Sequence, residues 1–127
     1  QLVVSGDAGR AINPKVCRGQ DEGSAVMGLT GALFPCMVYD GATLMNGNGL
    51  DYKVPLSTDL NDGFVSILQE QGHGPGPFGA KSVGEGCMLP VASAIANAVE
   101  DAIGVRIREL PLTPERVLAA IDDAQSP

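Results

Sequence analysis

The sequence predicts an α/β or α+β fold in which a mixed sheet is combined with helices. Short runs with strand character interleave with longer stretches of helical spacing, as in folds that layer helices on a sheet. The composition, 44% apolar and 18% charged residues, is that of an ordinary globular unit. Neither a repeat nor a linker divides the chain. We therefore expect residues 1–127 to form a single domain.

The first elements are expected to be a strand and a glycine-containing helix. Residues 2–5 form a short apolar run that leads into a turn, which predicts a strand. Residues 20–34 carry apolar side chains three and four positions apart, which predicts a helix that ends before Pro35. Its three interior glycines, Gly23, Gly28 and Gly31, each cost about 0.5 to 1 kcal/mol relative to Ala. We expect this helix to press against another backbone or a ligand.

A hairpin and a long loop are expected next. Residues 36–39 have strand character, and Asp40-Gly41 is a hairpin turn signal that leads into a second strand. Residues 46–62 are rich in Gly, Asn, Pro and Asp, which indicates a loop with one short strand at residues 52–54. Residues 64–69 alternate in polarity and again predict a strand.

Two helices are expected in the last third of the chain. Residues 89–103 form an amphipathic pattern, with an inner stripe of Val91, Ile95, Val99, Ala102 and Ile103, and Gly104 ends it. Residues 105–109 alternate and predict a short strand. Thr113 as N-cap and Pro114 at the first helical position then begin a helix that continues to about Ala120.

Charge and cysteine content exclude several classes of function. The net charge of −7 would repel the phosphate backbone of nucleic acid and anionic lipid surfaces. The longest uncharged stretch is shorter than the roughly 18 residues of a membrane span, so we expect no membrane partner. Three widely separated cysteines favour neither a disulfide framework nor a metal site. Reduced, buried thiols and a cytoplasmic location are expected.

The glycine-rich loop at residues 72–86 is open to three interpretations. Gly74 to Gly79 spells G-x-G-x-x-G, and Lys81-Ser82 follows in the manner of a P-loop, which would indicate nucleotide binding. Pro75 and Pro77 have no N–H for a phosphate, however, and the next helix begins too late. A structural surface loop is the second interpretation. The third is catalytic: Glu85 is bracketed by two glycines ahead of a helix, where a carboxylate can act as a general base.

Four short motifs follow one another along the chain. They are D-x-G-x-x-I-N-P at Asp7 to Pro14, G-Q-x-x-G at Gly19 to Gly23, D-Y-x-x-P at Asp51 to Pro55, and G-A-K-x-V-G-E at Gly79 to Glu85. In sequence and in order they resemble the molybdenum-binding subunit of the xanthine oxidase family of molybdenum hydroxylases. This family includes xanthine dehydrogenases, aldehyde oxidoreductases and carbon monoxide dehydrogenase. Together the four motifs extend over most of the chain. The resemblance implies a C-terminal fragment of the molybdopterin-binding domain.

The resemblance also implies the roles of individual residues. Glu85 would be the general base that removes a proton from a molybdenum-bound hydroxyl. Gln20 would hydrogen-bond the molybdopterin cofactor; its alternative role is to cap the start of a helix. The backbone of four further residues would line the same cofactor: Lys81, Ser82, Val83 and Gly84. No protein ligand to molybdenum is expected, because the dithiolene of the pterin holds the metal. Asp7 and Arg10 are expected to form a structural pair.

For the whole protein, the resemblance implies an oxidoreductase that hydroxylates an aldehyde or an N-heterocyclic substrate. The implied cofactor is molybdenum-molybdopterin, with the cytosine dinucleotide as one of its forms. The implied partners are the remainder of the molybdenum subunit and subunits or domains that carry iron–sulfur clusters and FAD. The fragment alone is expected to be inactive. A non-catalytic structural domain of the same fold and a phosphate-loop nucleotide binder are the alternative functions.

Overall fold

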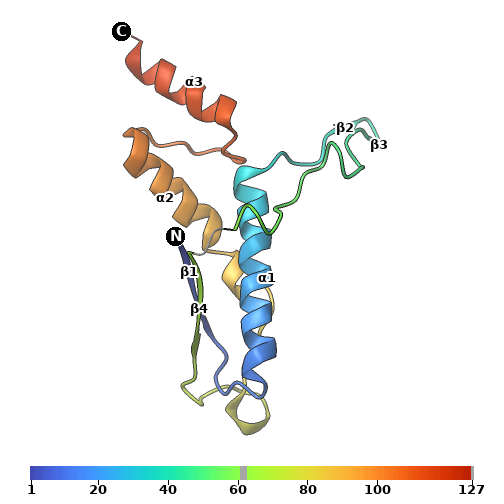
Figure 1. Cartoon of the computed structure of the whole chain (residues 1–127), viewed down its shortest axis with the longest axis vertical. Coiled ribbons are helices and arrows are strands. Elements are labelled where there is room, and N and C mark those ends of the chain that lie inside the picture. Colours follow the sequence, from blue (N-terminus) through green and yellow to red (C-terminus); the bar gives the residue numbers. More distant parts are fainter. Residues whose placement is uncertain (61–62, 127) are drawn as a thin grey trace.

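Strand β1, Leu2–Asp7, pairs in parallel with strand β4, Phe64–Gln69, and helix α1, Pro14–Leu33, packs against both (Figure 1). This computed structural model describes residues 1–60 and 63–126. The register joins Leu2 to Phe64 at one end of the pair and Asp7 to Gln69 at the other. Both predicted strands are confirmed, and β1 continues two residues beyond the predicted end.

Helix α1 begins six residues earlier than predicted. The Asn13 side chain accepts a hydrogen bond from the Val16 N–H at 3.2 Å, and Pro14 occupies the first helical position. Asn as N-cap followed by Pro is a helix-start signal, which the sequence prediction treated as part of a turn. The expected close approach of this helix to another backbone is confirmed at Gly28, where an added Cβ would lie 2.8 Å from the Met88 carbonyl oxygen.

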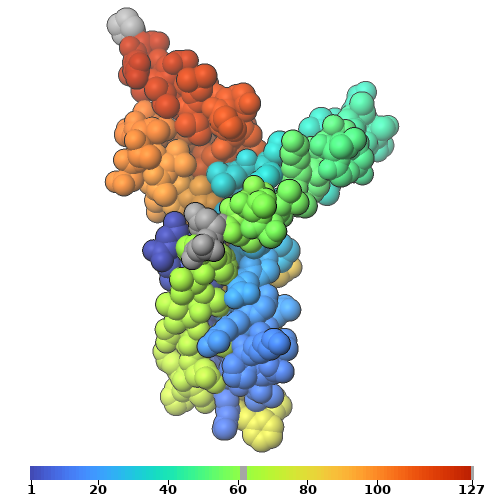
Figure 2. Space-filling view, viewed as in Figure 1, coloured from blue at the N-terminus to red at the C-terminus, as the bar shows by residue number. Residues whose placement is uncertain are grey.

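The segment at residues 36–60 projects from the body as an arm (Figure 2). It holds a short hairpin of β2, Tyr39–Asp40, and β3, Thr43–Leu44, so the hairpin prediction is confirmed. The strand predicted at residues 36–39 is reduced to Tyr39, because the Asn46 side chain bonds the Cys36 carbonyl and the Val38 N–H. The strand predicted at residues 52–54 is wrong. The last two residues of the predicted 46–62 loop lie outside the described residues.

Two short 3-10 helices, η1 at Pro77–Gly79 and η2 at Gly86–Met88, precede helix α2, Val91–Ile103, which packs on α1. Gly104 ends α2 in the left-handed conformation, as predicted. Helix α3 follows at Pro114–Gln125, five residues longer than predicted, and Thr113 caps its start. The strand predicted at residues 105–109 is wrong, since this segment lies beyond α2 and away from the β1–β4 pair (Figure 1). The Leu112 N–H instead bonds the Ala32 carbonyl at 2.7 Å.

The predicted α/β class is confirmed, with the strands divided between a parallel pair and a separate antiparallel hairpin. The core is small and consists of Val4, Ala25, Cys87 and Val91. Many large apolar side chains remain exposed, which is typical of faces that contact other parts of an assembly. Cys36 is among the exposed residues, so the prediction of buried thiols is wrong for this one. None of the described helices is long and apolar enough to cross a membrane.

Candidate functional site

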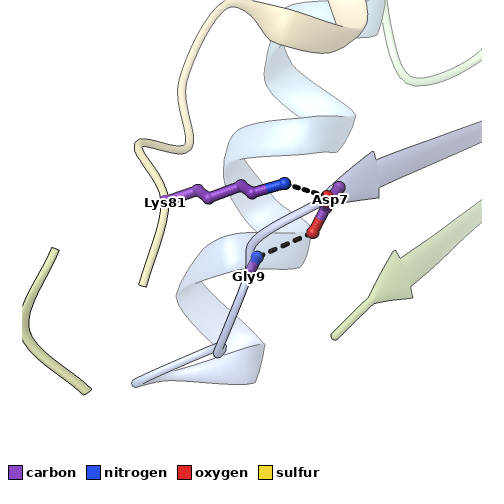
Figure 3. A network of polar contacts seen from close by, with 3 residues as sticks. All are labelled: Asp7, Gly9 and Lys81. Carbon is purple, nitrogen blue, oxygen red and sulfur yellow. Dashed lines mark hydrogen bonds and ion pairs between the residues drawn. The ribbon is translucent and has the colours of Figure 1, made fainter. Parts of the chain in front are cut away.

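Asp7, the last residue of β1, joins the exit of the strand to the segment that leads to Glu85. Its Oδ1 accepts a hydrogen bond from the Gly9 N–H at 2.8 Å, and its Oδ2 binds the ammonium of Lys81 (Figure 3). The ammonium of Lys81 and, to a smaller extent, the Gly9 N–H hold the pKa of Asp7 below its ordinary value. The ion pair of Asp7 is therefore with Lys81, which corrects the predicted pairing with Arg10.

Backbone hydrogen bonds connect the same two segments. The Lys81 N–H donates to the Ala8 carbonyl at 2.9 Å, and the Arg10 N–H donates to the Gly79 carbonyl at 3.0 Å. The turn after β4 joins them, since the Glu70 carboxylate accepts from the Ala11 N–H and the Gly9 carbonyl accepts from the Gly72 N–H. Residues 7–11, 70–72 and 79–81 thus form one hydrogen-bonded unit, here called the strand-exit cluster.

The glycine-rich loop between β4 and Lys81 is closed by its own hydrogen bonds. The Gly74 N–H donates to the Gly79 carbonyl at 2.8 Å, and the Gly76 N–H donates to the Ala80 carbonyl at 3.0 Å. Because these N–H groups already have partners and the intervening residues are prolines, the loop cannot direct a row of donors at a phosphate. Helix α2 also begins only at Val91. The geometry therefore argues against the nucleotide-binding interpretation.

Glu85 and Gln20 lie on one pocket of about 330 Å³. Gln20 stands on α1, and Glu85 comes directly before η2, which begins with a hydrogen bond from the Met88 N–H to the Glu85 carbonyl. Both side chains are exposed in this chain. Residues 65 positions apart in the sequence are thereby brought together, with an amide and a carboxylate available to the same group.

Glycines leave room in this pocket for a bulky molecule. Gly19 and Gly23 line it from α1, and Gly84 lines it from the segment before η2. A Cβ added at any of the three would meet nothing of the described chain within 4 Å. The packing of this chain therefore leaves this side of the pocket open, with room for an external group. The residues present fit a large hydrogen-bonding cofactor such as a pterin.

Comparison with known proteins identifies the family. A family model described as a molybdopterin cofactor-binding domain matches residues 1–61. The putative xanthine dehydrogenase molybdenum-binding subunit of Escherichia coli is 43% identical over 116 residues, which cover 87% of this chain and 15% of that protein. The chain belongs to the molybdenum hydroxylase family.

Solved structures of two oxidoreductases share the fold of this chain. Quinoline 2-oxidoreductase from Pseudomonas putida superposes with a TM-score of 0.80 at 28% identity, over 95% of this chain and 16% of that one. The aldehyde oxidoreductase of Desulfovibrio desulfuricans gives a TM-score of 0.80 at 31% identity, over 94% of this chain and 13% of that one. The chain thus spans about a seventh of the length of the relatives that it matches.

The residues predicted to bind the molybdenum hydroxylase cofactor divide between neighbouring pockets. Gly84 lies with Gln20 and Glu85. Lys81 and Val83 line an adjoining pocket of about 270 Å³, which Gln20 also reaches. Ser82 lines a different groove, along β1. The structure therefore brings Lys81, Val83, Gly84 and Glu85 to pockets that Gln20 also lines. Ser82 lines neither of these two pockets, and Val83 and Gly84 border its groove as well.

The ammonium of Lys81 is bound to Asp7. That the Lys81 backbone lines the cofactor stays a prediction. Within residues 1–60 and 63–126, no three side chains of His, Cys, Asp or Glu come together as a metal site. That the pterin dithiolene would hold the molybdenum stays a prediction.

Sequence reasoning missed a buried polar pair behind the Glu85 segment. Asp21 of α1 is only 4% exposed and lies beside Cys87 of η2. Burial and, to a smaller extent, Asp21 raise the pKa of the Cys87 thiol, because both disfavour a thiolate there. One signal was present in the sequence. The buried face of α1, Asp21, Ser24, Ala25, Gly28 and Ala32, follows helical spacing and places an acid on the inner side.

Proposed function

We propose that the protein to which this chain belongs is a molybdenum-dependent oxidoreductase that hydroxylates an aldehyde or an N-heterocyclic substrate, with Glu85 as general base. The observation that carries the proposal is the shared pocket of Gln20 and Glu85, lined by glycines that leave space for a large ligand. The names of the relatives support the reaction class, since they include a xanthine dehydrogenase subunit and an aldehyde oxidoreductase.

The residues of this chain that would hold the cofactor come from two elements that border the pocket, α1 and the segment before η2. The Gln20 amide offers both a donor and an acceptor to the polar edge of a pterin. Gly19 and Gly23 allow the ring system to approach the α1 backbone closely, and Gly84 does the same from the opposite segment. When bound, the molybdenum cofactor supplies the oxygen transfer and the two-electron oxidation.

Glu85 would act on a proton at the reacting oxygen. As a carboxylate, it accepts that proton through one of its side-chain oxygens, which makes the oxygen a better nucleophile toward an electron-poor carbon. The strand-exit cluster supports this role. It holds Lys81 by a backbone hydrogen bond to Ala8 and by the ion pair with Asp7, four residues before Glu85. The segment that carries the base is therefore anchored at Lys81, which helps to position it.

Glu85 is exposed in this chain, and a general base works best where water is excluded. We infer that the remainder of the molybdenum subunit closes the pocket and selects the substrate. Isolated residues 1–127 should accordingly show no turnover. We also propose that electrons leave through iron–sulfur and FAD groups on partner subunits or domains, because a two-electron oxidation needs an acceptor.

The variant Glu85→Gln in the complete protein tests the base directly. It keeps the size of the side chain and removes its ability to accept a proton, so kcat should fall by a factor of about 100 to 10,000. Molybdenum and pterin content per subunit should stay at the wild-type level. Glu109→Gln is a matched control, because Glu109 is exposed and lies outside the pocket. Near-native turnover of Glu85→Gln would sink the assignment.

A second pair of variants tests the cradle independently of catalysis. Gly23→Ala and Gly84→Ala each place a methyl group where this chain has only open space. If a cofactor occupies that space, both should lower molybdenum and pterin content without lowering the melting temperature of cofactor-free protein. Normal cofactor content in both variants would contradict the cradle. If the complete native protein contained no molybdenum, the alternative of a non-catalytic domain would be favoured. Release of CMP from the bound cofactor on acid hydrolysis would identify its cytosine dinucleotide form.

A further inference from the structure

The edge of β1 that faces away from β4 lines a groove of about 310 Å³. Toward β4, the Leu2 N–H bonds the Gly63 carbonyl and the Ala8 N–H bonds the Gln69 carbonyl, each at 3.0 Å. Backbone groups alternate in direction along a strand, so those of Val3, Ser5 and Asp7 point the other way. Within the described residues β1 pairs with β4 alone, and all six of its residues border the groove.

Asp21 reaches the same groove from α1 with an unsatisfied carboxylate oxygen. Its Oδ2 is buried and has no hydrogen-bond partner among the described residues. A Cβ added at Gly6 would lie 2.5 Å from that atom, so the carboxylate sits directly against the β1 backbone. A buried carboxylate oxygen without a donor is strongly unfavourable, and native proteins almost always provide one. The Cys87 thiol hydrogen-bonds the Asp21 carboxylate, and Oδ2 still has room for a further donor from the groove.

The opposite wall of the groove is largely apolar. Pro90, Val91 and Ala94 form it at the start of α2. The segment around the Glu85 position completes it with Ser82, Val83, Gly84, Gly86 and Cys87. A row of outward backbone groups, an apolar wall and one buried acid together match an extended peptide with a basic side chain. A compact ligand would use only part of the six-residue edge.

We propose that an extended strand from outside residues 1–127 pairs with the free edge of β1 and donates an Arg or Lys hydrogen bond to Asp21 Oδ2. The length of the relatives supports this occupant, because this chain matches only 15% of its Escherichia coli relative and the remainder must pack somewhere. Charge supports it too, since the chain carries a net charge of −7. The strand touches Val83 and Gly86, so it also supports the Glu85 segment from behind.

Hydrogen exchange resolved to single amides in the complete protein tests the pairing. The Val4 and Gly6 amides, which face β4, are an internal control and should be protected. The Val3 and Ser5 amides should be protected as well, exchanging on the order of 100-fold or more slower than in an unstructured peptide. Rapid exchange of Val3 and Ser5 beside slow exchange of Val4 and Gly6 would overturn the proposal.

Two other occupants give distinguishable results. Protection that depends on protein concentration would show that a second copy covers the edge. Protection that is present only in cofactor-loaded protein and absent from the cofactor-free form would show a small molecule instead. Either result would overturn the added strand. These measurements do not involve turnover, so they can fail or succeed whatever the role of Glu85.

The variant Asp21→Asn tests the basic side chain. It keeps the shape of the carboxylate but weakens a charged hydrogen bond, so exchange at Val3 and Ser5 should become on the order of tenfold faster or more. The neighbouring exposed residue provides a matched control, Glu22→Gln, which should leave both rates unchanged. Unchanged protection in Asp21→Asn would overturn the contact between Asp21 and a basic residue.

Discussion

The ammonium of Lys81 binds the carboxylate of Asp7 across 74 positions of sequence. This ion pair joins the end of β1 to the segment that carries Glu85, and the backbone bond from Lys81 to Ala8 lies beside it (Figure 3). The position of the candidate base therefore depends on the exit of a strand that is remote in the sequence.

Replacing Asp7 with Asn should change how the stability of the complete protein depends on acid. The pKa of Asp7 is lowered in the folded chain, so its stabilisation is fully present above the unfolded value, near 3.8. That stabilisation is lost as the pH falls from the pKa of Asp7 in the unfolded chain to its lower pKa in the folded chain. Urea unfolding of wild type and Asp7→Asn should thus differ at neutral pH and converge in acid. A difference that is constant with pH would contradict the ion pair, and Lys81→Met should behave like Asp7→Asn.

Two glycines of α1 should respond to alanine in opposite directions. At Gly28 an added Cβ would lie 2.7 Å from the Val91 Cβ and 2.8 Å from the Met88 carbonyl oxygen, so Gly28→Ala should destabilise by about 1 to 3 kcal/mol. At Gly31 it would meet nothing within 4 Å, so Gly31→Ala should stabilise by about 0.5 to 1 kcal/mol. Denaturant unfolding measures both. A destabilising Gly31→Ala would show that this face of α1 is covered in the complete protein.

The three cysteines should differ in their reactivity with a thiol reagent. Cys87 is buried and its pKa is raised by burial and by Asp21, so little thiolate is available and it should react slowest. Cys36 is exposed on the arm and should react fastest, with the half-buried Cys17 between them. Mass spectrometry of peptides after timed alkylation gives the order. Rapid modification of Cys87 in native protein would contradict its place in the core.

Phe78 should tolerate glycine better than a β-branched residue. Its backbone has a φ of 59°, in the left-handed region, and its side chain is 79% exposed. Phe78→Gly should leave the melting temperature unchanged or raise it, because it removes the strain and loses little packing. Phe78→Val should lower it, since β-branched residues fit that region poorly. A clear loss of stability in Phe78→Gly would show that the ring packs against another part of the complete protein.

Local signals in the sequence were sufficient for the elements whose ends are set by their own residues. Gly104 and the Thr113-Pro114 pair predicted where α2 ends and α3 begins, because capping depends on a few neighbouring residues. Residues 105–109 alternate in the manner of a strand, yet a strand needs a partner edge, and none of the described strands pairs with them. The early start of α1 at Pro14 was available from Asn13 and was overlooked.

By itself the sequence determined the α/β class and the order of the four family motifs. It also determined the two main candidates, Glu85 as the base and Gln20 as the residue that binds the cofactor. Only the tertiary structure decided that these two share a pocket, that Lys81 is paired with Asp7, and that Ser82 faces a separate groove. The physical reason is that a local pattern fixes backbone conformation over a few residues. Which side chains meet across 65 or 74 positions depends on how α1 and the strand-exit cluster pack against β1.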